Sequence, residues 1–230
     1  MVSWNLHYGV GPTGTVDLEA VAQTIEAYDP DVVLLQEVSR GWVQGGGADM
    51  ATWLSQRLDR PFVFGPAADG RFGNVILARG GLADPELLAL PFGEGPQQRS
   101  ALSARTQVGG VPVTATSIHI QHRASNSATR VRQVQTFLDS AAVEPGSPAR
   151  LVGGDLNATP GRPEVELLLG AGFVSAIDAA GDPAAFTDPS TAPYRRIDWV
   201  FGRGIGFSAA QVLTTVQLSD HLPLLVTVAP

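Results

Sequence analysis

Two short segments near the C-terminal end carry acids beside other polar residues. Residues 153–157 read Gly-Gly-Asp-Leu-Asn and follow an apolar run at 149–152, while residues 219–223 read Ser-Asp-His-Leu-Pro and follow a strand-like run at 212–218. Each pattern predicts a carboxylate and a second polar group at the end of a strand, where catalytic groups tend to gather.

Two upstream segments repeat this pattern, residues 34–37 (Leu-Leu-Gln-Glu) and residues 3–7 (Ser-Trp-Asn-Leu-His). Carboxylates, carboxamides and imidazoles that end four buried strands suit a hard divalent cation facing a phosphate. Glu37 needs a partner, because burial of an isolated charge is costly. A salt bridge to Arg40 is one interpretation. We favour a metal ligand, since Asn5 and Asp220 are expected at neighbouring strand ends.

Asp155 and Asn157 are separated by one residue, so in an extended segment both point to one face. Such a pair can hold a water or a phosphate oxygen. The alternative is an Asx turn in which Asn157 only redirects the chain. His221 follows Asp220 directly, and its plainer interpretation is a surface Asp–His pair in a turn.

Asp198 lies inside a strand pattern beside two arginines, Arg195 and Arg196. A buried acid of this kind commonly orients a histidine, although the arginines could instead neutralise it or contact phosphate. His119 ends an apolar β run, where an imidazole is either catalytic or simply hydrogen-bonded in the core. His122 reads as a loop residue.

Other catalytic motifs are absent from the sequence. A P-loop needs a lysine, and the chain has none. Gly9-Val10-Gly11 is not followed by the helix start that a dinucleotide fingerprint requires. No Gly-x-Ser-x-Gly elbow is present, so nucleophilic serine catalysis has no support.

These residues need a mixed α/β framework to position them. The periodicity predicts helices at residues 17–28, with Asp17 as N-cap, and at 50–58, 127–142 and 164–169. Further strands are expected at 2–6, 31–36, 62–64, 74–78, 101–108, 113–120, 197–201 and 222–228. The alternation predicts mixed sheets packed face to face and covered by helices. Nothing reads as a linker, so we expect one domain over residues 1–230.

The composition limits the kinds of substrate and partner that the protein is expected to bind. The hydrophobic content is 44%, the net charge is −7, all 15 basic residues are arginine and there is no cysteine. This balance favours a small or lipid phosphoester over a nucleic-acid polymer, which usually meets a basic face. No apolar run reaches the length of a membrane helix, and no signal peptide opens the chain. We expect a soluble monomeric domain, cytoplasmic or, if cut from a longer and membrane-anchored parent protein, extracytoplasmic.

Seven motifs occur in an order that carries a resemblance. They are Trp4-Asn5, Gln36-Glu37, Gly73-Asn74, Ile118-His119, residues 154–157, residues 196–200 and Ser219-Asp220-His221. The set closely resembles the endonuclease/exonuclease/phosphatase superfamily of DNase I-like metal-dependent phosphoesterases, over nearly the whole chain. The resemblance implies a four-layer α/β sandwich and Mg²⁺-dependent attack of water on a phosphorus ester, with Mn²⁺ as the alternative ion.

The resemblance also implies residue roles. Asn5 and Glu37 sit at the metal with Asp220 nearby, while Asp155 orients or deprotonates the attacking water and Asn157 holds a phosphate oxygen.

The remaining roles belong to groups near the substrate. His221 stabilises negative charge with Asp198 fixing its orientation, and His119 touches the scissile phosphate or the leaving oxygen. Asn74 and His7 are expected to contact substrate. His7 departs from the abasic-site enzymes, which carry an acid at this position, so a role at the metal stays open.

Three functions follow in order of preference. The first is a metal-dependent phosphodiesterase acting on a small or lipid-linked substrate. The second is a nuclease, for which Arg71, Arg123, Arg130 and Arg132 are candidate DNA contacts, although Arg130 and Arg132 fit the polar face of their helix. A groove lined by Arg71, Arg123 and Arg195 would favour this second function. The third is a non-catalytic binding module, which the intact polar set argues against.

Overall fold

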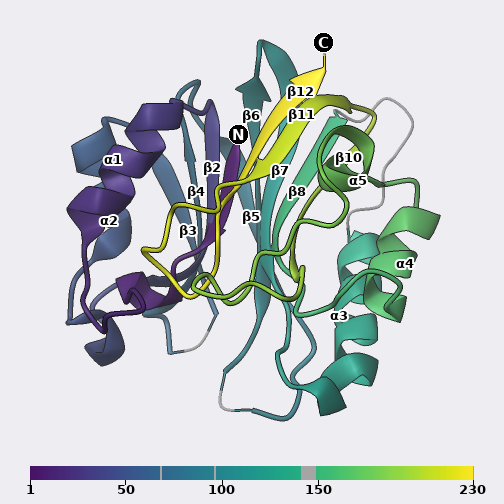
Figure 1. Ribbon diagram of the computed structural model, residues 1–230, viewed down its shortest axis with the longest axis horizontal. Coiled ribbons are helices and arrows are strands. Elements are labelled where there is room, and N and C mark those ends of the chain that lie inside the picture. Colours follow the sequence, from purple (N-terminus) through teal and green to yellow (C-terminus); the bar gives the residue numbers. More distant parts are fainter. Residues whose placement is uncertain (68, 96, 141–148, 230) are drawn as a thin grey trace.

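The structure, a computed structural model, describes residues 1–67, 69–95, 97–140 and 149–229, and it contains two six-stranded sheets packed face to face (Figure 1). One sheet has the order β11 (Gly206–Val212), β12 (Leu224–Ala229), β1 (Val2–Asn5), β2 (Val32–Ser39), β4 (Phe72–Ala78), β3 (Phe62–Pro66). The other has the order β5 (Ala83–Ala89), β6 (Ser100–Val108), β7 (Val111–His119), β8 (Ala149–Asp155), β10 (Asp198–Arg203), β9 (Val174–Ser175).

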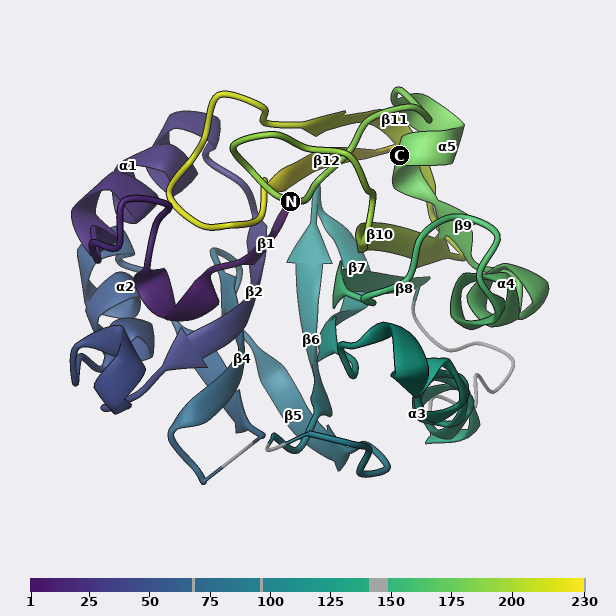
Figure 2. The same ribbon diagram turned by 60° about the horizontal axis from the view of Figure 1, so that its bottom comes forward.

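Helices cover the outer faces of both sheets and complete four layers, as predicted (Figures 1 and 2). Helices α1 (Leu18–Tyr28) and α2 (Met50–Leu58) lie over the first sheet, and α3 (Ser127–Ser140) and α4 (Pro163–Gly170) lie over the second. The short helix α5 (Ala176–Ala180) contacts β10 and β11. Asp17 caps α1 as expected, its side chain accepting a hydrogen bond from the backbone of Ala20 at 2.9 Å. Among the described helices, none combines the length and apolar character needed to cross a membrane.

The hydrophobic core has three parts, one between the sheets and one under each helical layer. Along β2, Val32 and Leu34 point into the space between the sheets, while Val33 and Leu35 pack towards α1 and α2. Both faces of this strand are therefore buried, which explains why its sequence is a continuous apolar run rather than an alternating one.

At the edge of the sheets where β1, β2, β7 and β8 end, the space between the two sheets contains polar side chains and the sheets lie close together. Gln36 donates its side-chain amide to Ser117 Oγ at 3.0 Å, and Ser117 in turn donates to the Leu35 carbonyl at 2.9 Å. A Cβ atom added at Gly153 would lie 2.9 Å from Ser3 Oγ. The glycine therefore lets β8 approach β1 closely, and the two sheets meet at the edge where the predicted polar residues lie.

The expected strand at 212–218 is wrong. Strand β11 ends at Val212, and the chain then turns, with the Val216 amide donating to the Leu213 carbonyl at 3.1 Å. Leu218 is apolar because it packs against the core beneath α1 and α2, not because it belongs to a strand. As a result, Asp220 and His221 lie in the loop that precedes β12.

Three other differences concern weaker elements. Strand β5 was not predicted, because its residues are mostly exposed and lack an apolar pattern. The short β9 and α5 were also missed. Helix α3 begins where predicted, but positions 141 and 142 of the expected helix lie outside the described residues.

Candidate active site

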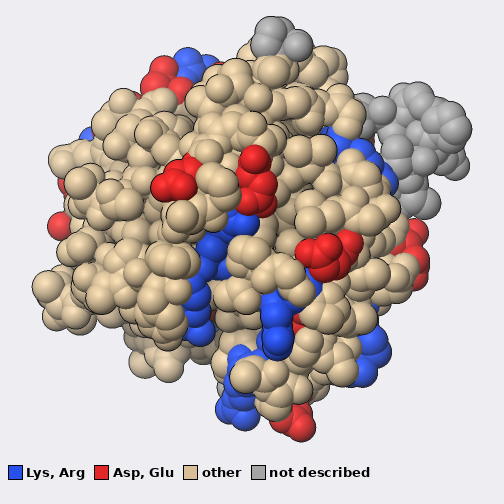
Figure 3. All heavy atoms as spheres, turned by 45° about the vertical axis from the view of Figure 1, so that its right-hand side comes forward, with Lys and Arg blue, Asp and Glu red and all other residues tan. Residues whose placement is uncertain are grey.

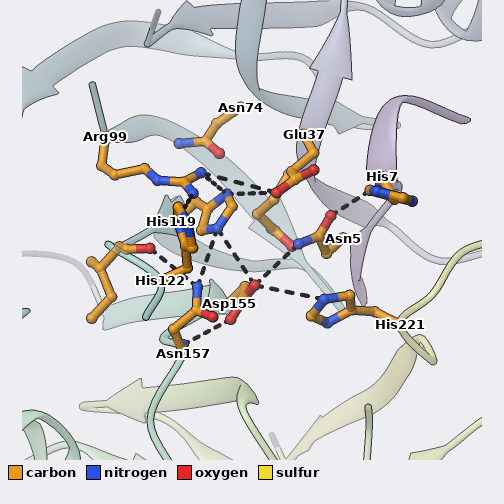
Figure 4. A network of polar contacts seen from close by, with 12 residues as sticks. Asn5, His7, Glu37, Asn74, Arg99, His119, His122, Asp155, Asn157 and His221 are labelled. Carbon is orange, nitrogen blue, oxygen red and sulfur yellow. Dashed lines mark hydrogen bonds and ion pairs between the residues drawn. The ribbon is translucent and has the colours of Figure 1, made fainter. Parts of the chain in front are cut away.

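A cleft of about 690 Å³ opens beside the C-terminal ends of β1, β7 and β8. Seven of the residues predicted for the site line it: His7, Glu37, His119, Asp155, Asn157, Asp220 and His221. Asn5 and Asp198 are buried and bond to lining residues, so the structure brings nine of the ten predicted residues together. Figure 4 shows Asn5, Glu37, His119 and His221 around Asp155. The exception is Asn74, which is buried, donates to the Ser100 carbonyl at 2.8 Å and does not line the cleft.

Strand register places three of these residues in a row. Asp155 ends β8, where it pairs with His119 of β7 on one side and with Asp198 of β10 on the other. Gly154 makes the pairing possible, because its φ is +157° and an added Cβ would lie only 1.7 Å from the Ile118 carbonyl oxygen. The glycine before Asp155 is therefore a requirement of the close strand contact.

The Asp155 carboxylate is surrounded by donors. Its Oδ1 accepts from the Asn157 backbone amide at 2.7 Å, and its Oδ2 accepts from the Asn5 side chain at 3.1 Å. Burial, against the opposing effect of His221 and with the help of the Asp198 carboxylate, raises the pKa of Asp155 to about 7. A carboxylate with a pKa near neutrality is suited to accept a proton under physiological conditions.

The expected extended geometry of residues 155–157 is wrong. Asn157 has a φ of +47°, and its amide bonds to the Asp155 side chain, which is an Asx-type turn. The turn does not remove Asn157 from the site. Its side-chain nitrogen lies 3.4 Å from His119 Nε2 and donates to the Ile120 carbonyl at 3.2 Å.

His221 is held in a ring of carboxylates. Its Nδ1 lies 2.8 Å from Asp198 Oδ2, while its Nε2 lies 3.7 Å from Asp188, 3.8 Å from Asp155 and 3.9 Å from Asp220. Burial acts to lower the pKa of His221, but the Asp198 and Asp155 carboxylates outweigh it and hold this pKa well above its usual value. His221 is therefore a cation at neutral pH, with Nε2–H directed at the cleft. Arg195 pairs with Asp188 rather than with Asp198.

His119 is in the opposite charge state. Burial, reinforced by the nearby Arg99 cation, holds the pKa of His119 well below its usual value. Arg99 is itself buried and reaches His119 Nδ1 at 2.9 Å, Gln121 Oε1 at 3.1 Å and His122 Nδ1 at 3.2 Å. Nothing in the sequence marks Arg99, which precedes β6 without any strand-end motif. His122 lies in a loop, as expected, but this loop lines the cleft.

Glu37 lies at an irregularity in the pairing of β2 with β4, with a φ of +54°. Its Oε1 lies 3.8 Å from His119 Nδ1 and 4.0 Å from Arg99 Nη1. Its Oε2 is buried and has no hydrogen-bond partner among the described residues. Burial raises the pKa of Glu37. Arg40, the alternative partner, instead bonds Asp49 at 2.8 Å.

Two sets of residues could hold a divalent cation. Asp155, Asp198 and His221 offer ligand atoms within 4.8 Å of one another. However, a histidine ligand must be neutral, and His221 is cationic and already bonded to Asp198. Glu37 Oε2 and Asp198 Oδ1 are both buried without a described hydrogen-bond partner, but Asp198 is already paired with His221. Glu37 therefore fits a cation better, because a buried carboxylate without a partner is costly. Asn5 and Asp220, the other residues expected at the ion, also carry side-chain oxygens.

An aromatic wall flanks the Glu37 side of the cleft. The rings of His7 and Tyr8 lie 4.8 Å apart, and those of Tyr8 and Trp42 lie 5.0 Å apart. Burial, with the Glu37 carboxylate, raises the pKa of Tyr8 to about 12, so its hydroxyl stays protonated. Neither Tyr8 nor Trp42 was predicted as a site residue, because single aromatics in a loop are not distinguishable from core residues by sequence.

The arginines proposed as nucleic-acid contacts differ in their burial and in their position relative to the cleft. Arg71 does not line the cleft, whereas Arg123 does. Arg130 does not lie on an exposed polar helix face, because it is buried and paired with Glu164 at 2.8 Å. Arg132 is exposed and lies away from the cleft lining.

The chain is similar to known proteins in sequence and in fold. A family model described as "Endonuclease/Exonuclease/phosphatase family" matches residues 2–221. Mouse tyrosyl-DNA phosphodiesterase 2 is 24% identical over 156 residues, which cover 68% of this chain but only 40% of that protein. The chain therefore matches less than half the length of this relative.

Two solved structures show the same fold. An endonuclease/exonuclease/phosphatase from Beutenbergia cavernae is 24% identical, with a TM-score of 0.80 over 99% of this chain and 70% of that one. A D. rerio TDP2 humanized by 14 mutations is 21% identical, with a TM-score of 0.74 over 100% of this chain and 98% of that one.

Proposed function

Since the chain belongs to the endonuclease/exonuclease/phosphatase family, we propose that it hydrolyses a phosphodiester by metal-assisted attack of water, with Asp155 as the group that activates the water. The observation that carries this proposal is the position of Asp155 between two histidines of opposite charge state. Its Oδ2 lies 3.4 Å from His119 Nε2 and 3.8 Å from His221 Nε2.

Asp155 orients the attacking water and accepts its proton. The pKa of about 7 places the carboxylate near the balance point between its charged and neutral forms, where a general base is most effective at neutral pH. The hydrogen bonds from Asn5 and Asn157 fix the rotation of the carboxylate, so little reorganisation is needed when the water attacks.

The other side chains act on the phosphate. Cationic His221 donates Nε2–H to an oxygen on which negative charge develops, and the Asp198 contact holds its ring in place. The Asn157 amide supplies a further donor on the same side of the cleft, beside neutral His119, whose Nε2 lies 3.4 Å from Asp155 Oδ2. Preorganised donors of this kind are each worth about 2.7–4 kcal/mol in the transition state.

Glu37, with Asn5 and Asp220, would hold Mg²⁺ or Mn²⁺, since these ions prefer oxygen ligands. When bound, the ion would supply Lewis-acid stabilisation of the charge on the phosphate. The partner substrate in this proposal is a phosphodiester of a small or lipid-linked molecule, because the net charge of −7 disfavours long polyanions.

A second candidate is a magnesium-dependent nuclease. It is favoured by Arg123, which lines the cleft, and by Arg195 in the adjoining pocket. It is weakened by Arg71, which lines neither of them. The same preparation should therefore be offered plasmid DNA and a single-stranded oligonucleotide.

The test is hydrolysis of bis(p-nitrophenyl) phosphate in Mg²⁺ by wild type, by Asp155→Asn and by Asp139→Asn, an exposed control on α3. Asp155→Asn keeps the shape of the side chain but not its basicity, so its kcat should fall roughly 10²-fold or more, with KM little changed. Asp139→Asn should match wild type. Wild-type turnover in Asp155→Asn would remove Asp155 from the chemistry.

A further inference from the structure

A second cavity of about 250 Å³ adjoins the catalytic cleft and is lined by four arginines, Arg123, Arg130, Arg162 and Arg195. Arg123 and Asn157 line both cavities, so the two spaces meet at these residues. No aspartate or glutamate lies among the described residues that line the second cavity. Figure 3 shows basic side chains in the middle and lower part of the face that it draws, which is the side of the molecule that carries α3 and α4.

Only two of the four arginines have their charge balanced. Arg130 pairs with buried Glu164 at 2.8 Å, and Arg195 pairs with Asp188. Arg123 and Arg162 are exposed and take part in none of the ion pairs between described residues. The cavity therefore carries an excess of positive charge beside Asn157, in a chain whose total charge is negative.

Buried groups fix the wall of this cavity. Arg130 is 2% exposed, and its Nη1 donates to the Arg123 carbonyl at 2.7 Å and to the Gln121 carbonyl at 3.2 Å. These bonds hold Arg123 in an unusual conformation, with a φ of +68°. Such backbone conformations cost free energy in non-glycine residues and persist only where the surroundings enforce them. The position of Arg123 at the junction is therefore enforced by a buried ion pair.

We propose that this arginine pocket binds a second phosphate of the substrate, one linking unit away from the phosphate that is cleaved. The inference rests on the proposed phosphodiesterase function and narrows its substrate class to diesters that carry another phosphate, as nucleotides and phosphorylated polyol headgroups do. Guanidinium groups suit this task because their planar fork of donors matches phosphate oxygens. Asn157 lies between the two phosphate positions and contacts both cavities.

Two chromogenic diesters test the pocket: the p-nitrophenyl ester of thymidine 5′-phosphate, with and without a 3′-phosphate. Wild type should show a higher kcat/KM for the substrate with the 3′-phosphate. In Arg162→Gln, kcat/KM for the substrate with the 3′-phosphate should fall about tenfold. The kcat/KM for the substrate without it should not change, because Arg162 lines only the second cavity. Arg132→Gln, an exposed arginine outside both cavities, is the matched control and should behave as wild type.

A binding measurement separates failure of the pocket from failure of the proposed function. Titration calorimetry with thymidine 3′,5′-bisphosphate and thymidine 5′-monophosphate needs no turnover. Wild type should bind the bisphosphate more tightly, and Arg162→Gln should lose that preference while Arg132→Gln keeps it. Equal affinities in wild type, or equal losses in both variants, would overturn the proposal. A phosphorylated-inositol lipid in vesicles and a short oligonucleotide, assayed in parallel, tell which source of the second phosphate is preferred.

Discussion

Arg99 Nη1 lies 2.9 Å from His119 Nδ1. A guanidinium can only donate hydrogen bonds, so His119 accepts at Nδ1 and carries its proton on Nε2. This nitrogen lies 3.4 Å from Asp155 Oδ2. Arg99 thus adds to the effect of burial, which lowers the pKa of His119, and directs the remaining proton of the ring at the carboxylate.

The first prediction concerns this contact. In Arg99→Gln the cation that lowers the pKa of His119 is lost, so this pKa should rise and the ring should sample both tautomers. Nitrogen-15 spectra of the imidazole rings should find one Nε2–H tautomer in wild type from pH 6 to pH 8 and a mixture in the variant. Arg99→Lys, which keeps the charge, should restore part of the wild-type spectrum. A ring that is protonated in wild type would contradict the assignment.

The second prediction concerns stability. The pKa of Asp155 is 3.8 in an unperturbed chain and about 7 in the fold, so between these values the folded state keeps a proton that the unfolded state releases. The contribution of Asp155 to folding is therefore most favourable at acid pH and declines as the pH rises towards 7. Asp155→Asn escapes this decline and should be more stable than wild type above pH 7, by about 1–2 kcal/mol.

Urea unfolding at several pH values, with a chelator present, measures this difference. The gap between Asp155→Asn and wild type should widen from acid to neutral pH, while Asp139→Asn should track wild type throughout. If the difference in unfolding free energy between Asp155→Asn and wild type does not change with pH, burial does not raise the pKa of Asp155.

The third prediction concerns the cation at His221. Its pKa is raised chiefly by Asp198, so the protonated ring persists until the pH passes well above its usual value. Asp198→Asn removes that carboxylate and should lower the pKa of His221 by about one unit or more. If catalysis needs the cation, the alkaline decline of kcat should move to lower pH by the same amount. If kcat falls in Asp198→Asn but its pH dependence is unchanged, the role of Asp198 is purely structural.

The fourth prediction concerns the metal. Glu37→Gln removes the charge of a cleft-lining carboxylate whose buried Oε2 has no described hydrogen-bond partner, so divalent-ion affinity should fall roughly 10–100-fold. Calorimetric titration with Mn²⁺ measures it without reference to turnover, and a chelator should abolish wild-type activity. Glu166→Gln, an exposed change on α4, is the control. Unchanged Mn²⁺ affinity in Glu37→Gln would place the ion elsewhere.

The sequence was sufficient for much of the architecture and for the strand-end acids. Continuous apolar runs mark strands that are buried on both faces, and Asp155 stands directly after one of them. What it could not supply were contacts made across strands. Arg99 meets His119 only because β6 and β7 pair, and Asn157 turns because its amide finds the Asp155 carboxylate. The loop after Val212 was expected to be a strand, because the spacing of apolar residues does not distinguish a loop packed on the core from a hydrogen-bonded strand.

The first and last parts of the chain are joined at the site itself. Strand β12 pairs with β1, the Ser219 hydroxyl donates to the Asn5 carbonyl at 2.7 Å, and the Trp4 ring donates to the His221 carbonyl at 3.0 Å. The residues joined by these two hydrogen bonds are 214 and 217 positions apart in the sequence. A chain that ends before Ser219 would lack His221 and both of these contacts, so we expect it to leave this side of the cleft unformed.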